Sequence, residues 1–238
     1  MEHRPSRPFL CIGHRGARGH APENTLLSIE TALRLGAHWV EVDVHPLEGR
    51  LVVLHDDTVD RTTNGRGPLS SFTLEALRRL DAGRGERIPF LEEVLELLNG
   101  RAGLVVEMKG LGSAALLPAV LRRALVEGFN PGRLTVSSFH REELLAFREA
   151  ALPVATAVLS STFQEEALRF AQEMGASALH LGLRGAAPGA LRRCREAGLP
   201  VYVFTVNEPE DIRRMYHGGA AGVFTDFPDR VAPALELC

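Results

Sequence analysis

Short apolar runs alternate with longer amphipathic segments along the whole chain. The short runs are rich in Val, Leu and Ile and are bounded by turn-forming residues, a pattern typical of buried strands. Eight such runs predict strands at residues 9–13, 39–44, 104–109, 134–138, 154–159, 178–181, 201–206 and 222–225. Between them, apolar positions recur at helical spacing, which predicts helices at residues 24–36, 91–98, 116–126, 142–150, 165–174 and 190–197.

Regular alternation of strand and helix favours an α/β fold built on a parallel sheet. The chain has 238 residues, close to the roughly 250 that a (β/α)₈ barrel commonly uses as one unit. We therefore expect residues 1–238 to form a single domain with the α/β fold of a (β/α)₈ TIM barrel. A doubly wound open sheet has the same alternation and remains the alternative.

One segment interrupts this alternation. Residues 51–55 predict an extra extended piece after the second strand, and residues 56–89 are rich in Gly, Arg, Asp and Thr, with a short helical pattern at 73–80. Loops at the carboxyl ends of the strands are where barrels of this kind vary. We therefore expect a small insertion at about residues 50–89, lying over the mouth of the barrel.

Charge and composition narrow the classes of partner. The formal net charge is −3, from 27 basic and 30 acidic residues spread along the chain, so no binding to nucleic acid is expected. Apolar stretches are far shorter than the roughly 20 residues that span a bilayer, and the basic N-terminus lacks the apolar core of a signal peptide. We expect a cytoplasmic protein without stable membrane insertion. The three cysteines form no CxxC pair and predict neither a disulfide framework nor a thiolate metal site.

Carboxylates with a shared orientation mark the second and third predicted strands. Side chains two apart on a strand point the same way, so Glu41 and Asp43 share one face while the flanking valines share the other. Because those valines suit packing beneath outer helices, the acids should face the barrel axis. Glu107 and Lys109 repeat the spacing on the third strand. Three oxygen ligands without a thiolate suit a hard divalent cation, Mg²⁺ or Ca²⁺, better than Zn²⁺.

The same residues also have plainer interpretations. Two acids on one strand can lie on a solvated face, and Glu107 with Lys109 can form an ordinary structural ion pair. Lys109 is, however, the single lysine among 27 basic residues, all the others being arginine. An ammonium at this position suits contact with an anionic oxygen.

Two histidines are candidates for proton transfer. His14 in GHRG directly follows the first strand, with Arg15 beside it, at the end of the strand where barrel enzymes place their active sites. His55 closes the extra strand in LVVLHDD, on the face of Leu51 and Val53, and can return a second imidazole to the mouth. With an ordinary pKa of about 6.5, one histidine can act as acid and the other as base. A lone histidine is more often structural, which is what we expect of the other seven.

Seven motifs, taken in order, resemble those of the glycerophosphodiester phosphodiesterase family over nearly the whole chain. They are GHRGARGHAPENT at 13–25, EVDVH at 41–45, LVVLHDDTVDRTTNGRG at 51–67, VVEMK at 105–109, SSF at 137–139, FTVN at 204–207 and GVFTDFP at 222–228. Each motif alone is weak, whereas seven in order at suitable spacing are highly specific. The resemblance implies a metal-dependent phosphodiesterase on a barrel with an inserted segment at its mouth.

The resemblance also implies that His14 and His55 are the acid and base, and that Arg15 holds the phosphate. The residues implied to bind a divalent metal are Glu41, Asp43 and Glu107. The residues implied to bind the substrate or to shape its site are Lys109, Asn24, Phe139 and Phe204. Two departures from the family pattern are a Phe at 204, where Trp is frequent, and LEGR, where Thr-x-Asp-Gly often leads into the extra strand.

The expected reaction is hydrolysis of a small glycerophosphodiester to glycerol 3-phosphate and an alcohol. The attacking group can be water or the glycerol 2-hydroxyl, and the sequence selects neither it, nor the head group, nor an oligomeric state. A phospholipase C or D acting on lipid is the alternative, although the polar insertion favours a deacylated substrate. A noncatalytic phosphate binder and an isomerase or aldolase using Lys109 are more distant alternatives.

Overall fold

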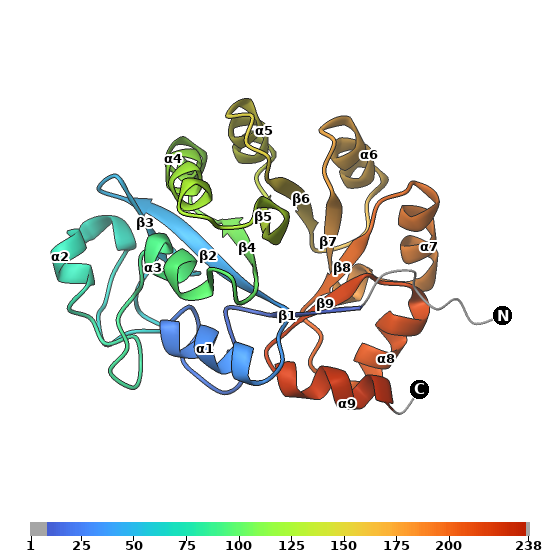
Figure 1. Cartoon of the computed structure of the whole chain (residues 1–238), viewed down its shortest axis with the longest axis horizontal. Coiled ribbons are helices and arrows are strands. Elements are labelled where there is room, and N and C mark those ends of the chain that lie inside the picture. Colours follow the sequence, from blue (N-terminus) through green and yellow to red (C-terminus); the bar gives the residue numbers. More distant parts are fainter. Residues whose placement is uncertain (1–8, 237–238) are drawn as a thin grey trace.

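Within residues 9–236, which the computed structural model describes, eight parallel strands close into a barrel (Figure 1). These strands are β1 (Leu10–Gly13), β2 (Trp39–Leu47), β4 (Gly103–Met108), β5 (Leu134–Ser138), β6 (Ala155–Ser160), β7 (Ala178–Gly182), β8 (Val201–Phe204) and β9 (Gly222–Thr225). Strand β1 pairs in parallel with both β2 and β9, which closes the ring. The predicted (β/α)₈ barrel is confirmed, and the alternative of an open doubly wound sheet is wrong.

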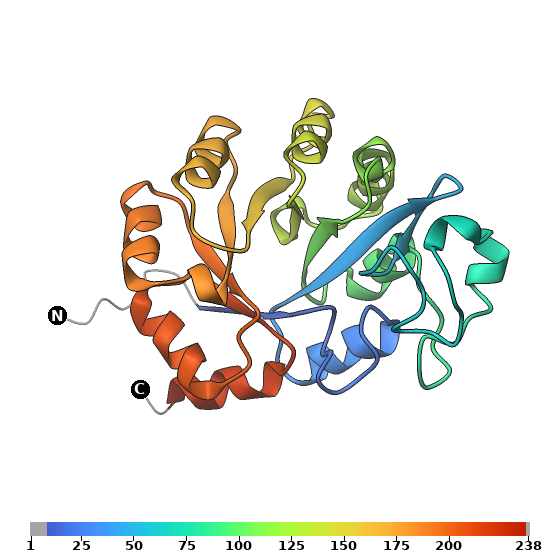
Figure 2. The same ribbon diagram turned by 180° about the vertical axis from the view of Figure 1, so that it is seen from behind.

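Helices form an outer layer around the barrel, as Figures 1 and 2 show from opposite sides. They are α1 (Leu26–Arg34), α3 (Leu91–Leu98), α4 (Ser113–Val126), α5 (Arg141–Glu149), α6 (Glu165–Glu173), α7 (Pro188–Glu196), α8 (Pro209–Gly218) and α9 (Val231–Glu236). The six helices predicted from apolar spacing are present, and the structure adds α8 and α9, which the apolar spacing did not predict. Of the helices in the described part of the chain, none is long and apolar enough to cross a membrane.

The two faces of the strands carry different chemistry. The valines of β2 point outwards into the main hydrophobic core beneath the helices, as the alternating pattern predicts: Val40, Val42 and Val44. A second, inner cluster fills the barrel itself and includes the buried side chains of Ile12, Val105 and Phe224. Apolar side chains fill much of the interior, and the acidic side chains of β2 and β4 lie on the same inner face.

The segment between β2 and α3 protrudes beside α1 and α3 (Figure 1). It contains β3 (Arg50–Val53), which pairs antiparallel with β2, and the short helix α2 (Leu74–Leu77). Its apolar side chains form a small cluster separate from the main core, with Val52, Val59, Leu69 and Ile88 among its members. The insertion therefore supports its own loops by local packing.

His55 is placed by a bend rather than by strand alternation. Strand β3 ends at Val53, two residues before His55, and both Leu51 and Val53 pack into the main core. The backbone N–H of Leu54 then donates to the carbonyl oxygen of Asp43 at 3.1 Å. This bond holds the bend against β2, so His55 leaves the strand beside the carboxylates instead of following its apolar face.

Candidate active site

Three buried carboxylates converge near the carboxyl ends of β2 and β4. Asp43 and Glu107 are partners in the register of these parallel strands, and Glu41 lies two residues before Asp43 on the same face. One oxygen from each carboxylate lies within 4.8 Å of the other two. The structure thus brings together the three acids that the sequence singled out.

Burial makes this cluster costly unless a cation neutralises it. Burial, together with the charge of Asp43, raises the pKa of Glu41 well above its usual value, and the same two causes raise the pKa of Glu107 to about 7. Among the described residues, no hydrogen-bond donor reaches Glu41 Oε1 or Asp43 Oδ1. Carboxylate oxygens that accept no hydrogen bond are the ligands that a hard divalent cation such as Mg²⁺ or Ca²⁺ prefers. The three acids therefore fit a divalent metal.

Arg15 and Lys109 lie against the same carboxylates. Arg15 Nε is 3.3 Å from Asp43 Oδ2, and the backbone N–H of Arg15 donates to Glu41 Oε2 at 2.8 Å. Lys109 Nζ is 2.7 Å from Glu107 Oε1 and 3.8 Å from Asp43 Oδ1. Burial lowers the pKa of both bases, but the neighbouring carboxylates outweigh burial and raise it overall. Two firmly protonated groups therefore flank the acids.

Asn24 holds Asp43 in place. Its Nδ2 donates to Asp43 Oδ2 at 2.9 Å, and its Oδ1 accepts from the backbone N–H of Asp43 at 3.3 Å. Asn24 has a φ of 58°, in the left-handed region that asparagine tolerates, and its backbone N–H donates to the carbonyl oxygen of Arg15. The buried amide thus shapes the site by orienting a carboxylate.

His14 is fixed by a carboxylate from the other end of the chain. His14 Nδ1 lies 2.7 Å from Oδ1 of Asp226, the residue directly after β9. Asn207 donates from Nδ2 to Asp226 Oδ2 and accepts the backbone N–H of Asp226, both at 2.9 Å. Burial lowers the pKa of His14, although the bond to Asp226 acts in the opposite direction.

Sequence reasoning did not select Asp226 or Asn207 as site residues. Both lie in motifs on which the family resemblance rests, GVFTDFP and FTVN. The signal that points to them is position, because each follows the carboxyl end of a barrel strand. Strand β9 is also the neighbour of β1 in the closed barrel, which brings Asp226 next to His14.

His55 has a carboxylate partner of its own. His55 Nδ1 lies 2.6 Å from Oδ1 of the next residue, Asp56. Asp56 accepts two hydrogen bonds from Arg61, and Arg61 donates two more to Glu23 in the loop after β1. Burial lowers the pKa of His55, against the raising effect of Asp43 and Asp56. Sequence reasoning missed Asp56 and Glu23 and treated Arg61 only as a polar residue of the insertion, because charged loop residues are usually solvated.

Aromatic rings border Lys109. Its Nζ lies 5.5 Å from the centroid of the Phe139 ring, within the range of a cation–π contact. Phe139 packs edge to face on Phe204, with ring centroids 6.0 Å apart, and remains 40% exposed. Phe139 and Phe204 therefore form an apolar wall next to the ammonium.

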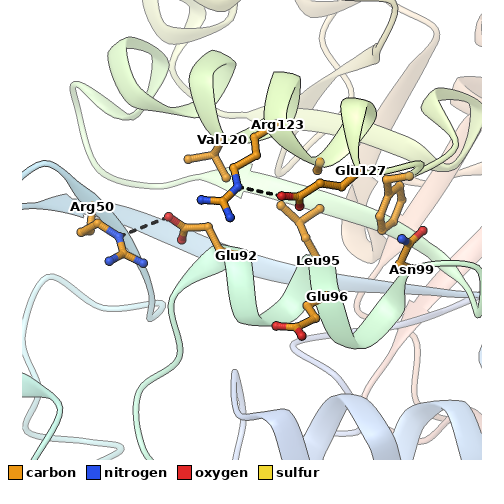
Figure 3. Close-up of a pocket in the computed structure, with 10 residues that line it drawn as sticks. Arg50, Glu92, Leu95, Glu96, Asn99, Val120, Arg123 and Glu127 are labelled. Carbon is orange, nitrogen blue, oxygen red and sulfur yellow. Dashed lines mark hydrogen bonds and ion pairs between the residues drawn. The ribbon is translucent and has the colours of Figure 1, made fainter.

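A separate groove lies outside the barrel, between α3 and α4 (Figure 3). It has a volume of about 660 Å³, and none of the described residues that line it is a predicted site residue. Four of its charged side chains form two ion pairs: Arg50 Nε is 3.2 Å from Glu92 Oε1, and Arg123 Nε is 2.8 Å from Glu127 Oε1. The groove therefore offers no cluster of unpaired reactive groups comparable to the barrel mouth.

Direct contacts join the three acids to Arg15, Lys109, Asn24, Phe139 and Phe204. The charge of Asp43 also acts, against the effect of burial, to raise the pKa of both His14 and His55, so the two imidazoles lie at the same end of the barrel as the acids. These acidic, cationic and imidazole side chains lie where (β/α)₈ barrels have their active sites. Fold and site together define the class, a (β/α)₈-barrel enzyme with a polar site at the carboxyl ends of its strands.

The chain belongs to the glycerophosphoryl diester phosphodiesterase family, whose model matches residues 14–230. A glycerophosphodiester phosphodiesterase of Caldanaerobacter subterraneus subsp. tengcongensis is 37% identical over 232 residues, which cover 92% of this chain and 95% of that protein. The enzyme of Bacillus altitudinis is 34% identical over 241 residues, covering 94% and 97%. The resemblance seen in the sequence is confirmed, and the chain is a phosphodiesterase of this hydrolase family.

Solved structures agree with this assignment. A phosphodiesterase of Oleispira antarctica, in complex with the product sn-glycerol-3-phosphate, has a TM-score of 0.88 and 30% identity, with 97% of each chain covered. A glycerophosphodiester phosphodiesterase of Agrobacterium tumefaciens has a TM-score of 0.81 and 29% identity, covering 95% of this chain and all of that one. This chain is therefore similar to known phosphodiesterases over its whole fold.

Proposed function

We propose that this protein hydrolyses small glycerophosphodiesters to glycerol 3-phosphate and an alcohol in a divalent-metal-dependent reaction. The observation that carries the proposal is the convergence of two carboxylate-bound imidazoles and two cationic side chains on the cluster of Glu41, Asp43 and Glu107. The product bound to the Oleispira antarctica phosphodiesterase supports a substrate of this class, because the two proteins share fold and family.

Arg15 and Lys109 bind the phosphate group of the substrate. A phosphodiester carries one negative charge, and its cleavage develops further charge on the phosphoryl oxygens and on the departing oxygen. A divalent cation held by Glu41, Asp43 and Glu107 would supply a Lewis acid for the phosphoryl oxygens. Once the acids are neutralised, the guanidinium and ammonium groups can exchange carboxylate partners for phosphate. Phe139 and Phe204 would then bound the glycerol side of the pocket.

His14 and His55 divide the proton transfers. Each has Nδ1 bound to a carboxylate, which favours the Nδ1–H tautomer and leaves Nε2 for the reactants. One imidazole removes a proton from the attacking hydroxyl, and the other gives a proton to the alcohol oxygen as its bond to phosphorus breaks. Each transfer is worth about 10²-fold to 10⁴-fold in rate. The attacking group is water, or the glycerol 2-hydroxyl through a cyclic phosphate that water then opens.

A phospholipase acting on lipid diesters is the second candidate. It is favoured by two apolar side chains on the loops after β4 and β5, since Leu111 is 69% exposed and Phe139 is 40% exposed. The insertion side of the site is polar, with Arg61, Arg66 and Arg84 exposed, which suits a deacylated substrate better. Hydrolysis of phosphatidylcholine liposomes that exceeds hydrolysis of glycerophosphocholine would favour the lipid substrate.

The test of the proposal is release of glycerol 3-phosphate from glycerophosphocholine, glycerophosphoethanolamine, glycerophosphoinositol and glycerophosphoglycerol. We expect turnover of at least one, loss of turnover after treatment with EDTA, and recovery when Mg²⁺, Ca²⁺ or Mn²⁺ is restored. Activity that survives complete chelation would contradict the metal-dependent form of the proposal. Release of the free alcohol with no glycerol 3-phosphate would contradict the assigned product.

A further inference from the structure

A chain of ion pairs runs from the phosphate-binding side of the site to His55. Arg15 donates from Nη1 to Glu23 Oε1 at 2.7 Å. Arg61 then joins Glu23 to Asp56, and Asp56 contacts the imidazole of His55. Arg15 follows β1, whereas Asp56 and Arg61 belong to the part of the insertion that follows β3. This series of ion pairs therefore links two separate segments of the protein across the mouth of the barrel.

Arg61 is the shared member of this chain. Its Nε and Nη2 donate to the two carboxylate oxygens of Asp56 at 2.7 and 3.0 Å, and its Nη1 and Nη2 donate to the two oxygens of Glu23 at 2.7 and 2.9 Å. A guanidinium can serve two carboxylates at once because its donors spread over a rigid plane, which an ammonium cannot reproduce. Both acids are thereby held in fixed orientations.

The pKa values of Glu23 and Asp56 are lowered, as expected of carboxylates that are tightly hydrogen-bonded to a guanidinium group. The pKa of Glu23 is lowered to about 2, because hydrogen bonds and charge from Arg61 and Arg15 outweigh the raising effect of burial. The bond from Arg61 is also the main cause that lowers the pKa of Asp56. The side chain of Glu23 is only 9% exposed. This arrangement differs from an ordinary surface ion pair, in which both partners are solvated and the pair contributes little to the stability of the protein.

We propose that Arg61 is a positioning residue that orients His55 through Asp56 and Arg15 through Glu23. The inference rests on the proposed function, in which His55 transfers a proton and Arg15 binds phosphate. The hydrogen bonds of Arg61 go to Asp56 and Glu23, and within residues 9–236 none goes to His55 or Arg15. Its effect on turnover is indirect and has two parts, one through Asp56 to His55 and the other through Glu23 to Arg15. We expect the first part to change mainly kcat and the second to change mainly KM.

Four variants test the two connections of Arg61, one to His55 through Asp56 and the other to Arg15 through Glu23. Asp56→Asn weakens the hold on His55 and should lower kcat by about 10-fold or more, with a small change in KM. Glu23→Gln weakens the hold on Arg15 and should mainly raise KM. Arg61→Met removes both connections and should lower kcat/KM by about 10-fold to 100-fold through both constants. Arg61→Lys should recover little of the loss, because one ammonium cannot bind both carboxylates in the same geometry.

Arg79→Met is the matched control. Arg79 lies in the same insertion and pairs with Glu75, but both side chains are more than 70% exposed, at 72% and 79%. This variant should retain wild-type kcat and KM. Thermal unfolding and titration of active sites should accompany each kinetic measurement, so that loss of folded enzyme is not counted as loss of rate per site.

The outcomes are distinct. The inference is overturned if Arg61→Met has wild-type kcat and KM per active site, or if it lowers only the melting temperature and the fraction of active enzyme. A wild-type protein that releases no glycerol 3-phosphate would instead overturn the proposed function. Even then, ¹⁵N NMR of the His55 ring tests Arg61 directly. A loss of the Nδ1–H signal of a fixed tautomer in Arg61→Met supports the inference, and an unchanged signal refutes it.

Discussion

His14 Nδ1 lies 2.7 Å from Asp226 Oδ1, although 212 positions separate the two residues in the chain. Closure of the barrel produces this pair, because β1 and β9 are neighbours and each residue directly follows the end of its strand. Asn207 holds the carboxylate from the other side. The imidazole therefore has a fixed orientation before any substrate arrives, which lowers the cost of reaching a reactive geometry.

Replacing Asp226 with Asn should lower kcat by about 100-fold or more, because an amide can hold the ring of His14 in the wrong tautomer. Asp229→Asn is the matched control, since Asp229 binds His20 at the same 2.7 Å distance outside the site. The measurement is steady-state release of glycerol 3-phosphate. Equal activity in both variants would show that the Asp226 contact has no part in turnover.

Removing either candidate imidazole should remove most of the rate while leaving the fold intact. We expect His14→Ala and His55→Ala each to lower kcat by about 10²-fold to 10⁴-fold. His217→Ala, at an exposed position on α8, should behave as the wild type. Circular dichroism and thermal unfolding establish that the variants are folded. A near-normal rate in either site variant would contradict the two-histidine mechanism.

Divalent cations should stabilise the folded protein. Binding to the native state alone raises the free energy of unfolding, by about 2.7 kcal/mol at a concentration 100 times Kd. Glu107→Gln should abolish most of this gain yet leave the metal-free protein no less stable, because Gln removes a buried charge from the acidic cluster. The exposed Glu165→Gln serves as control, and the measurement is the melting temperature against added Mg²⁺ or Ca²⁺. A melting temperature that rises equally in wild type and Glu107→Gln would place the stabilising ion elsewhere.

His180 should make the protein sensitive to acid. Its imidazole packs against Tyr202 and Phe224 inside the barrel, and burial lowers its pKa to about 3. The unfolded chain binds this proton with a pKa of about 6.5, so the contribution of His180 to the free energy of unfolding falls as pH drops from about 6.5 to 3. Near pH 5, this loss is about 2 kcal/mol.

His180→Phe retains ring packing and removes the titration. Relative to wild type, its free energy of unfolding should therefore improve by about 2 kcal/mol between neutral pH and about pH 5, where the other titrating groups are common to both proteins. Denaturant unfolding at the two pH values measures this difference. A difference that stays constant with pH would mean that His180 is not held neutral in the folded barrel.

The alternating pattern predicted the barrel because buried parallel strands and amphipathic helices each leave a local signature. The same alternation identified the shared face of Glu41 and Asp43, since strand geometry alone determines it. It did not find the contact of His14 with Asp226, which depends on how the ends of the barrel meet. Nor did it find the ion pairs that connect Arg15 to His55 through Arg61. Loop conformation determines those contacts, and the periodicity of strands and helices gives no information about it.

A crystal structure with Mn²⁺ and glycerol 3-phosphate would show where the metal and the product bind, because anomalous scattering locates the ion independently of the protein coordinates. We expect one Mn²⁺ bound by Glu41, Asp43 and Glu107 at roughly 2.0 to 2.3 Å, with the phosphate of the product between His14 and His55. An ion bound away from these carboxylates, or a phosphate bound out of reach of both imidazoles, would contradict this expectation.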